Sequence, residues 1–286
     1  MNLKAYANQI KKQLENAGVS SPAFEVALLF EKVFSLSRTQ LLSPEREIDE
    51  NLEENREKMT RLEAMVSRRM EGYPLQYLLG EWEFFGLPFW VGEGVLIPRP
   101  DTETVVEQAL ALLKGKEAPR ILDLCSGSGC IAIALAHERP DSRVTAVELS
   151  EKAFSYLERN RERNQAVNLA AVQGDALDTG CVDGKFDLIV SNPPYIRPEE
   201  MEALQKEVQF EPKMALRAEE EGLFFYKRIS RLWKGRIRPG GYLLFEIGWK
   251  QAAQVMEILR QEGFMQVGCA KDYGGNDRAV WGRSNR

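Results

Sequence analysis

The sequence is poor in residues that build metal sites and has no long apolar run. Its single histidine is His137, and its four cysteines include no C-x-x-C pair, so it has no recognisable zinc-ligand spacing. No apolar run approaches the roughly 18 residues of a membrane span, and Met1 to Ile10 lack the apolar core of a signal peptide. These absences predict a cytoplasmic protein with reduced thiols, no metal and no membrane partner.

An excess of positive charge is also missing. The chain has 38 Lys and Arg against 43 Asp and Glu, a formal net charge of −5. A molecule of that sign does not attract a polyanion as a whole, so we expect no direct nucleic-acid substrate. With 286 residues, 44% of them hydrophobic, the chain is long enough for two domains. We expect it to act as a monomer.

The first part of the chain has a helical pattern. Apolar residues recur at helical spacing over Leu3–Leu14, and Ser21-Pro22 has the form of an N-cap followed by proline at the first helical position. Ser43-Pro44-Glu45 predicts another helix start, before a longer charged helix that ends near Gly72. Residues 1–75 contain no glycine-rich loop and no histidine. We interpret them as a helical substrate-recognition domain, with a purely structural cap as an equal alternative.

A short β-rich segment is expected next. Aromatic residues alternate between 82 and 91 with glycines among them, which predicts a β-hairpin linker over residues 76–100. Two flanking prolines hold Arg99 in an extended conformation. Asp101 or Thr102 is expected to cap the following helix. These side chains either line a pocket or serve only the helix end.

Strands and helices alternate from Arg120 onward. Ile121–Leu124 reads as a buried strand, Cys125–Gly129 as a glycine-containing turn, and the apolar stretch after it as a helix. The second strand, Arg143–Val147, ends in Glu148, whose carboxylate can accept both hydroxyl hydrogens of a ribose. Residues 101–286 are therefore predicted to form a doubly wound α/β domain that binds an adenosine-bearing ligand.

The details favour S-adenosylmethionine over a dinucleotide. The turn is not G-x-G-x-x-G, and Asp123 beside it would repel a phosphate but suit a cation. S-adenosylmethionine carries an ammonium and a sulfonium and has no phosphate. Asp175 follows a third strand and is expected to bond the adenine amino group. The predicted cofactor-binding residues are Asp123, Cys125, Ser126, Gly127, Ser128, Gly129, Glu148, Asp175, Ala176 and Asn192.

The most distinctive motif is Asn192-Pro193-Pro194-Tyr195, directly after the predicted strand Phe186–Ser191. Two consecutive prolines remove two N–H donors and fix φ near −65°, so the loop must be stiff and extended. It lies where ligands of open α/β sheets collect. A rigid amide in that place indicates chemistry, although a plain proline-rich turn has the same local sequence.

These motifs together resemble class I methyltransferases that act on planar amide or amino nitrogens. Leu96–Glu103, Glu211-Pro212, Phe245–Gly248 with Gln251, and Asp277-Arg278 narrow the resemblance to peptide chain release factor glutamine N5-methyltransferases, over nearly the whole chain. The resemblance implies a seven-stranded catalytic sheet, a small helical N-terminal domain that helps to bind the release factor, and methyl transfer to the glutamine of a Gly-Gly-Gln motif.

The family usually has glycine where this chain has Cys125. We expect binding to survive this departure if the backbone geometry at Cys125 is ordinary.

The chemistry expected of such an enzyme is positioning. A carboxamide nitrogen is a poor nucleophile and too weak an acid for an ordinary side chain to deprotonate. The Asn192 side-chain oxygen and the Pro193 carbonyl are expected to accept the two amide hydrogens, with the Tyr195 ring packed against the flat amide. The predicted catalytic residues are Asn192, Pro193 and Tyr195, and the predicted substrate-binding residues are Asn192, Pro193, Pro194, Tyr195 and Arg99.

Three other functions use the same features. A nucleic-acid adenine N6-methyltransferase would use this loop on an extruded base, but the acidic balance and the lack of a basic insert argue against it. An inactive S-adenosylmethionine-binding scaffold would leave the complete Asn192–Tyr195 loop unexplained. A glutamine methyltransferase for a ribosomal protein stays open.

Overall fold

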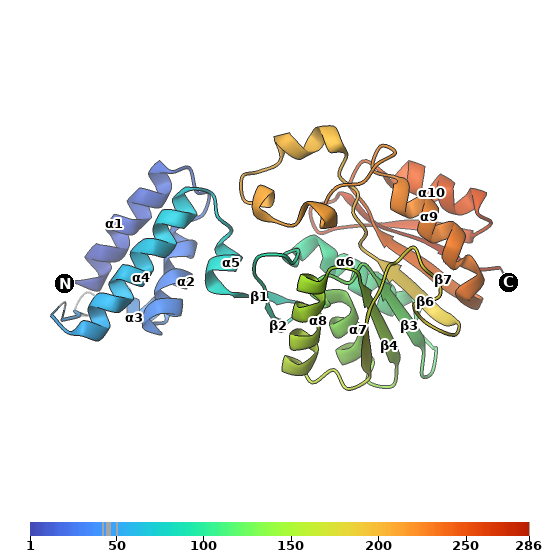
Figure 1. The fold of residues 1–286 in the computed structure, drawn as a ribbon, viewed down its shortest axis with the longest axis horizontal. Coiled ribbons are helices and arrows are strands. Elements are labelled where there is room, and N and C mark those ends of the chain that lie inside the picture. The colour runs from blue at the N-terminus through green and yellow to red at the C-terminus, as the bar shows by residue number, and fades with distance from the viewer. Residues whose placement is uncertain (42, 44–46, 50, 286) are drawn as a thin grey trace. The chain divides into compact units, whose positions relative to one another are not determined.

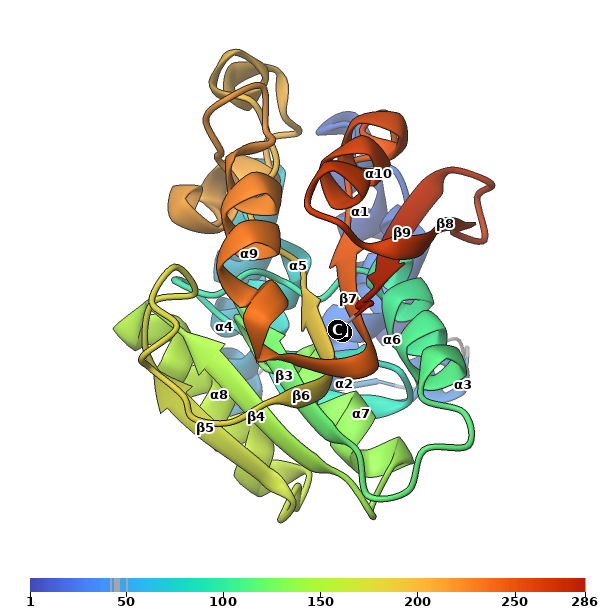
Figure 2. The ribbon, with the colours of Figure 1, turned by 90° about the vertical axis from the view of Figure 1, so that its right-hand side faces the viewer.

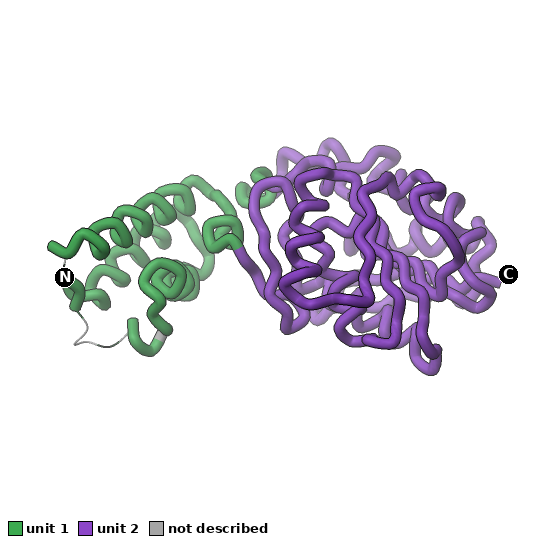
Figure 3. Tube along the Cα trace, turned by 60° about the horizontal axis from the view of Figure 1, so that its bottom comes forward, with its two compact units in different colours: residues 1–80, 205–210 green, residues 81–204, 211–286 purple. Residues whose placement is uncertain are grey.

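The structure, a computed structural model, describes residues 1–41, 43, 47–49 and 51–285. The chain divides into two compact units (Figure 3). The helical unit consists of residues 1–80 and 205–210, and the sheet unit consists of residues 81–204 and 211–286. Among the described residues, no helix combines the length and the apolar character needed to cross a bilayer.

The helical unit packs an amphipathic set of helices around one apolar core (Figure 1). Pro22 is the first residue of its second helix, as predicted, but the Ser21 side chain makes no capping hydrogen bond. The predicted start at Ser43-Pro44-Glu45 falls mostly outside the described residues, and the described long helix begins at Glu53. The helices are α1 (Leu3–Asn16), α2 (Pro22–Phe34), α3 (Arg38–Leu41), α4 (Glu53–Met70) and α5 (Leu75–Leu79).

The buried guanidinium of Arg69 connects residues 205–210 to this unit. Arg69, buried on α4, donates to both carboxylate oxygens of Glu25 at 2.6 and 3.0 Å and to Glu207 at 3.0 Å. Tyr73 contacts Phe210 edge-on, with ring centroids 5.3 Å apart. Because a buried charge needs partners, the segment that carries Glu207 completes the core of the helical unit.

The sheet unit starts with a hairpin and continues as a doubly wound sheet. Strands β1 (Glu81–Phe84) and β2 (Leu87–Trp90) pair antiparallel, as the alternation of aromatic residues predicted. Phe85 and Gly86 between them both have positive φ, which a two-residue hairpin turn of type I′ requires. The main strands are β3 (Arg120–Leu124), β4 (Arg143–Glu148), β5 (Leu169–Gln173), β6 (Phe186–Ser191), β7 (Ile237–Glu246), β8 (Met265–Lys271) and β9 (Asp277–Arg283).

The seven-stranded sheet has the order β5-β4-β3-β6-β7-β9-β8. The first five strands in this order are parallel, and β9 pairs antiparallel with both β7 and β8. The chain reverses its direction across the sheet between β3 and β6, so their carboxyl ends meet at the topological switch point. The predicted fold class is confirmed.

Helices form a layer on each face of the sheet (Figure 2). One layer contains α6 (Pro100–Leu112), α7 (Cys130–Glu138) and α8 (Glu151–Arg163), which contact one another in sequence. The other contains α9 (Phe224–Trp233) and α10 (Ala252–Gln261). Because side chains alternate along a strand, Leu122 and Leu124 face α9 while Asp123 faces the opposite layer.

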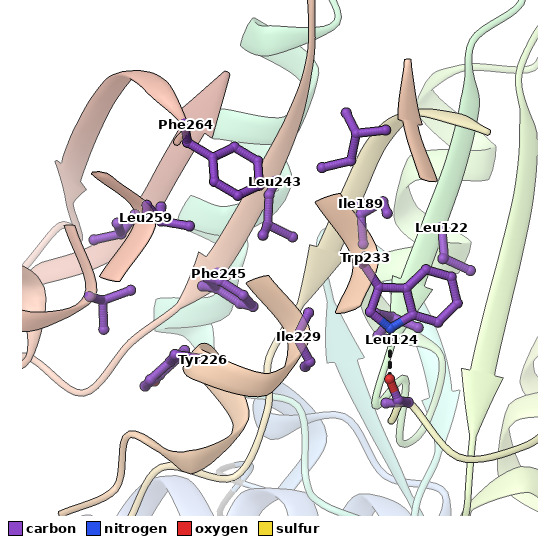
Figure 4. Packing of buried hydrophobic residues seen from close by; sticks show 14 of the residues in the cluster. Leu122, Leu124, Ile189, Tyr226, Ile229, Trp233, Leu243, Phe245, Leu259 and Phe264 are labelled. Atoms are coloured by element: carbon purple, nitrogen blue, oxygen red, sulfur yellow. Dashed lines mark hydrogen bonds between the residues drawn. The ribbon is translucent and has the colours of Figure 1, made fainter. Parts of the chain in front are cut away.

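The core under α9 extends from the strands of the sheet to the loop after β5 (Figure 4). Tyr226, Ile229 and Trp233 on α9 are fully buried against strand residues that include Leu122. The Trp233 indole N–H donates to the Ala176 carbonyl at 2.7 Å. This hydrogen bond fixes the loop after β5 to the core under α9.

The start of α6 differs from the expectation. The helix begins at Pro100 with Arg99 as its N-cap, and no side chain caps it. Proline is favoured at the first helical position because its missing N–H would be unsatisfied there anyway. Asp101 and Thr102 therefore lie inside the first turn. Asp101 pairs with Arg278 at 3.1 Å, and Thr102 donates its hydroxyl to Glu246 at 2.6 Å.

Candidate active site

A cavity lies in the sheet unit where four parallel strands end. Its walls come from the carboxyl ends of β3, β4, β5 and β6 and from residues 94–96 and 212–215, and the space between them, part of it open to solvent, measures about 720 Å³. Ligands of open α/β sheets collect at this edge. The apolar part of the wall is formed by Leu96, Val147, Leu149, Ala176, Met214 and Phe225.

Apart from Asp123, the predicted cofactor residues divide into two groups. Ser126, Ser128 and Gly129 shape the turn after β3 and do not line the cavity. The Ser126 hydroxyl donates to the Asp123 carbonyl at 2.9 Å, the Ser128 carbonyl accepts from Asn160, and a Cβ at Gly129 would overlap Leu157. The residues that do line the cavity are Cys125, Gly127, Glu148, Asp175, Ala176 and Asn192.

Glu148 ends β4 with its carboxylate at the cavity wall. One oxygen accepts from the Gly127 N–H and the other from the Ser150 N–H, both at 2.8 Å. Burial raises the pKa of Glu148, and these backbone donors oppose the rise. Each carboxylate oxygen keeps a second lone pair, so the fixed carboxylate can accept two hydroxyl hydrogens of a ligand.

Asp123 lies one step below the cavity wall. The side chain is fully buried, and in the described part of the chain neither carboxylate oxygen has a hydrogen-bond partner. Burial raises the pKa of Asp123 to about 8. A buried carboxyl group without a partner favours a nearby positive charge, which agrees with a cationic ligand at this edge.

Asp123 should make the stability of the ligand-free protein depend on pH. Its folded-state pKa of about 8 exceeds its ordinary value of 3.8, so between these values the unfolded state releases a proton that the folded state keeps. The free energy of unfolding should therefore fall as the pH rises from 4 to 8, by up to about 1.4 kcal/mol per pH unit from this group. Urea unfolding at several pH values measures this slope. Asp123→Asn should make the slope shallower, leaving the part due to Glu246, whose pKa burial raises to about 7, and an unchanged slope would contradict the assignment.

The Asn192 loop presents unused acceptors at the cavity. Ser191, the last residue of β6, is fully buried and donates its hydroxyl to the Leu124 carbonyl at 2.7 Å. Asn192 and Pro194 line the cavity. Within the described residues, neither the Asn192 side chain nor the Pro193 carbonyl takes part in a hydrogen bond of the chain. The Asn192 side chain is thus available to a ligand in the cavity, whereas Pro193 is buried and does not line the cavity.

Tyr195 lies on the other side of this loop. It lines a second cavity of about 1080 Å³ together with Ile196 and residues around Trp249. Its hydroxyl donates to Glu246 at 3.4 Å, and burial raises its pKa. The structure therefore places Asn192 and Tyr195 at neighbouring cavities that flank one loop.

Arg99 does not line the cavity but holds its wall together. It forms an ion pair with Glu211, whose side chain is fully buried and also accepts from the Ile97 N–H at 2.9 Å. The chain segments next to this pair, at Leu96 and Pro212, both contribute to the wall. This ion pair gives Arg99 a structural role beside the cavity.

Comparison with known proteins agrees with this geometry. Residues 105–219 match the family model "Methyltransferase small domain", and residues 6–80 match "PrmC N-terminal domain". A release factor glutamine methyltransferase of Fusobacterium nucleatum is 43% identical over 96% of this chain and 76% of its own length. One from Salmonella typhimurium is 38% identical over 99% of both chains.

The chain belongs to the release factor glutamine methyltransferase family. The predicted family and the prediction of a methyltransferase enzyme are confirmed. A crystal structure of a methyltransferase from Pyrococcus furiosus superposes with a TM-score of 0.53 at 19% identity, covering 80% of this chain and 99% of that one. At that identity the likeness shows the fold alone.

Several residues of the site had no assigned role in the sequence. Glu211, Glu246 and Gln251 lie in segments that carry the family resemblance, which was the available signal, but their partners are far away in the chain. The apolar wall residues Met214 and Phe225 carry no motif of their own.

Cys125 stands where the sequence resemblance implies glycine, and its backbone has a conformation that favours glycine. Its φ is +60°, in the left-handed region, so the condition of ordinary backbone geometry does not hold. This conformation costs a side-chain-bearing residue about 1–2 kcal/mol relative to the right-handed one. Cys125 also lines the cavity, so its thiol occupies space beside the ligand site.

A pair of substitutions should isolate this strain. Cys125→Gly and Cys125→Ala both remove the thiol, but only glycine adopts a φ of +60° without penalty. The glycine variant should therefore be more stable than the alanine variant by about 1 kcal/mol. Denaturant unfolding of the two proteins measures the difference. Alanine equal to or above glycine would show that position 125 is not strained.

Proposed function

We propose that this chain transfers a methyl group from S-adenosylmethionine to the side-chain amide nitrogen, N5, of the glutamine in the Gly-Gly-Gln motif of peptide chain release factors. The observation that carries the proposal is Asn192 Oδ1, an unused acceptor at the cavity wall, on a stiff loop in which the neighbouring Pro193 carbonyl is also unused. Full-length relatives named release factor glutamine methyltransferases support the choice of substrate. We place this reaction, translation termination and the protein itself in the cytoplasm.

The residues of the cavity fit S-adenosylmethionine. Glu148 offers two fixed acceptors for the ribose hydroxyls, and Asp175 on the wall suits the adenine amino group. The buried, unpaired Asp123 favours a cationic ligand over one with phosphates. When bound, this cofactor supplies an electrophilic methyl group on a sulfonium.

The chain's own contribution to catalysis is positioning. A glutamine side-chain nitrogen has two hydrogens, and two acceptors held in a fixed relation determine the direction of its lone-pair face. Asn192 and Pro193 are held because the loop starts at the buried Ser191 and continues through two prolines. Orientation of reactants supplies up to about 7–11 kcal/mol in favourable cases. No group near Asn192 is required to remove a proton before transfer.

Tyr195 follows the two prolines after Asn192 and lines the second cavity. We assign it to the placement of the target amide through the loop that it terminates, since its hydroxyl already donates to Glu246. Arg99 acts on the cavity through its ion pair with Glu211.

We further propose that residues 1–75 help to bind the release factor. The family model "PrmC N-terminal domain" covers residues 6–80, and these residues form a compact unit separate from the sheet unit that contains the cavity. A chain without residues 1–80 should still bind S-adenosylmethionine, measured by calorimetry, and should methylate an intact release factor at least about 10-fold less efficiently, a loss of about 1.4 kcal/mol. Methylation at the native rate would assign these helices a structural role only.

One assay tests the proposed substrate. The purified protein is incubated with S-adenosylmethionine that carries a labelled methyl group and with one of four candidate substrates. These are a release factor, the same factor with alanine in place of the motif glutamine, ribosomal proteins, and DNA. Label should enter only the release factor that has its glutamine. Label in ribosomal protein or DNA, or in the alanine-substituted factor, would replace the proposed substrate by the one labelled.

A further inference from the structure

The loop of Asn192 needs an anchor beyond its prolines. At its start the loop is fixed by the buried Ser191 hydroxyl, which donates to the Leu124 carbonyl at 2.7 Å. Pro193 and Pro194 have no N–H with which to hold the loop from within. The far end must therefore be held at Tyr195 or later. Backbone hydrogen bonds of Ile196 with Leu216 and Ala218, both 2.8 Å long, hold the chain directly after Tyr195, so Tyr195 itself needs a separate anchor.

Gln251 supplies this anchor from the N-cap position of α10. Its Nε2 donates to the Tyr195 carbonyl at 3.2 Å. Its Oε1 accepts from the Gly248 N–H at 3.0 Å and lies 3.2 Å from the Tyr226 hydroxyl, whose single hydrogen can go either to this oxygen or to the Glu246 carbonyl, also at 3.2 Å. Because the oxygen faces the Gly248 N–H, the amide nitrogen must face Tyr195. The side chain thus links the loop to a fully buried tyrosine of the core.

Two glycines make room for this arrangement. Gly222 has a φ of +78°, and a Cβ there would overlap the Tyr195 carbonyl and lie 2.6 Å from Gln251 Nε2. A Cβ at Gly248 would lie 2.9 Å from Gln251 Oε1. The backbone therefore closes around the amide of Gln251 and leaves it little freedom to turn away.

The Tyr195 side chain has a second anchor. Its hydroxyl donates to Glu246 Oε1 at 3.4 Å, while Glu246 Oε2 accepts from Thr102 at 2.6 Å. Glu246 is buried at the end of β7. Tyr195 is thus held at its carbonyl by Gln251 and at its ring by Glu246.

We propose that Gln251 is a positioning residue for methyl transfer. It holds the Tyr195 carbonyl at one end of the proline pair, and this contact keeps the Asn192 side chain at the other end directed toward the target amide. The inference rests on the proposed function for its catalytic meaning. A misplacement of about 1 Å at a reacting group costs on the order of 10²-fold in rate. Loss of the anchor should lower the single-turnover rate by about 10- to 100-fold and change S-adenosylmethionine affinity less than about 2-fold.

A matched residue on the same helix provides the control. Gln254 lies on α10, is exposed and borders the second cavity, and within the described residues its side chain makes no hydrogen bond. Gln251→Ala should show the loss in single-turnover rate with unchanged cofactor affinity, and Gln254→Ala should behave like the native enzyme. Equal rates for the two variants would overturn the inference.

The isosteric change Gln251→Glu adds a readout that a general loss of structure would not give. An ionised carboxylate cannot donate to the Tyr195 carbonyl, whereas a protonated carboxyl group can. The rate of this variant divided by the native rate at each pH should therefore rise as the pH falls from 8 to 5. The same ratio for Gln254→Glu should stay flat. A flat ratio for Gln251→Glu would contradict a donor role.

Hydrogen exchange tests the anchor without any substrate. The Ile196 N–H donates to the Leu216 carbonyl at 2.8 Å directly after Tyr195. Gln251→Ala should speed exchange at Ile196 at least about 10-fold, a change of about 1.4 kcal/mol in local opening, and Gln254→Ala should not. If the native protein fails to methylate release factors but exchange responds, the proposed function fails and the anchor stands. Unchanged exchange overturns the anchor whatever the substrate.

Discussion

Replacing Asn192 by alanine should lower turnover by about 10²- to 10³-fold, as does the loss of one preorganised hydrogen-bonding group in other active sites. The fold should survive, because within the described residues the Asn192 side chain makes no hydrogen bond to the protein and the strand beneath it is unchanged. Single-turnover rates, with thermal unfolding as the check on folding, measure the effect. An alanine variant with near-native turnover would remove Asn192 from the mechanism.

Asn192→Asp is the matched comparison because it keeps an acceptor and the shape of the side chain. The added negative charge stabilises a cationic cofactor more before the reaction than in the transition state, where positive charge disperses. The aspartate variant should therefore bind S-adenosylmethionine at least as tightly as the native enzyme, yet turn over more slowly. Weaker cofactor binding by this variant would place Asn192 away from the cationic centre.

Of the substitutions considered, Trp233→Ala should lower the free energy of unfolding the most. The indole is fully buried in the core under α9, and truncating a buried tryptophan costs about 3–5 kcal/mol. Its N–H also supports the Ala176 carbonyl at 2.7 Å, and Ala176 lines the cavity. Cofactor affinity should therefore fall together with the free energy of unfolding of the sheet unit, measured by denaturant titration.

Two controls separate packing from hydrogen bonding at Trp233. Trp233→Phe keeps most of the apolar contact but leaves the buried Ala176 carbonyl without its donor, which should cost about 1–3 kcal/mol. Trp249→Ala removes the same kind of side chain from a position that is 56% exposed and should change stability by less than about 0.5 kcal/mol. Equal losses for Trp233→Ala and Trp249→Ala would contradict this account of the core.

The strand and turn pattern of the sheet unit could be predicted because it depends on local chemistry. Apolar runs such as Phe186–Ser191 indicate strands buried on both faces, and all four strands predicted from Ile121 to Ser191 are present. The proline pair after Ser191 determines a stiff loop wherever the rest of the chain lies. Glu148 is the last residue of β4, and this position places its carboxylate at the edge of the sheet.

Hydrogen bonding at the site was less predictable because the partners come from distant segments. Thr102 was expected to cap a helix, but its hydroxyl instead donates to Glu246, which is 144 residues away. Arg99 was expected to bind substrate, and it pairs with Glu211, 112 residues away. A local pattern shows which groups are polar, but it does not show which of them fold to the same place.

By itself the sequence determined the fold class, the glycine-containing turn after β3 and the stiffness of the Asn192 loop, since hydrophobic periodicity and proline geometry act over a few residues. Only the tertiary structure decided that Cys125 has a left-handed backbone, that residues 205–210 complete the helical unit, and that Gln251 holds Tyr195. These features depend on long-range packing, in which a buried polar group takes whichever partner the folded chain brings within reach.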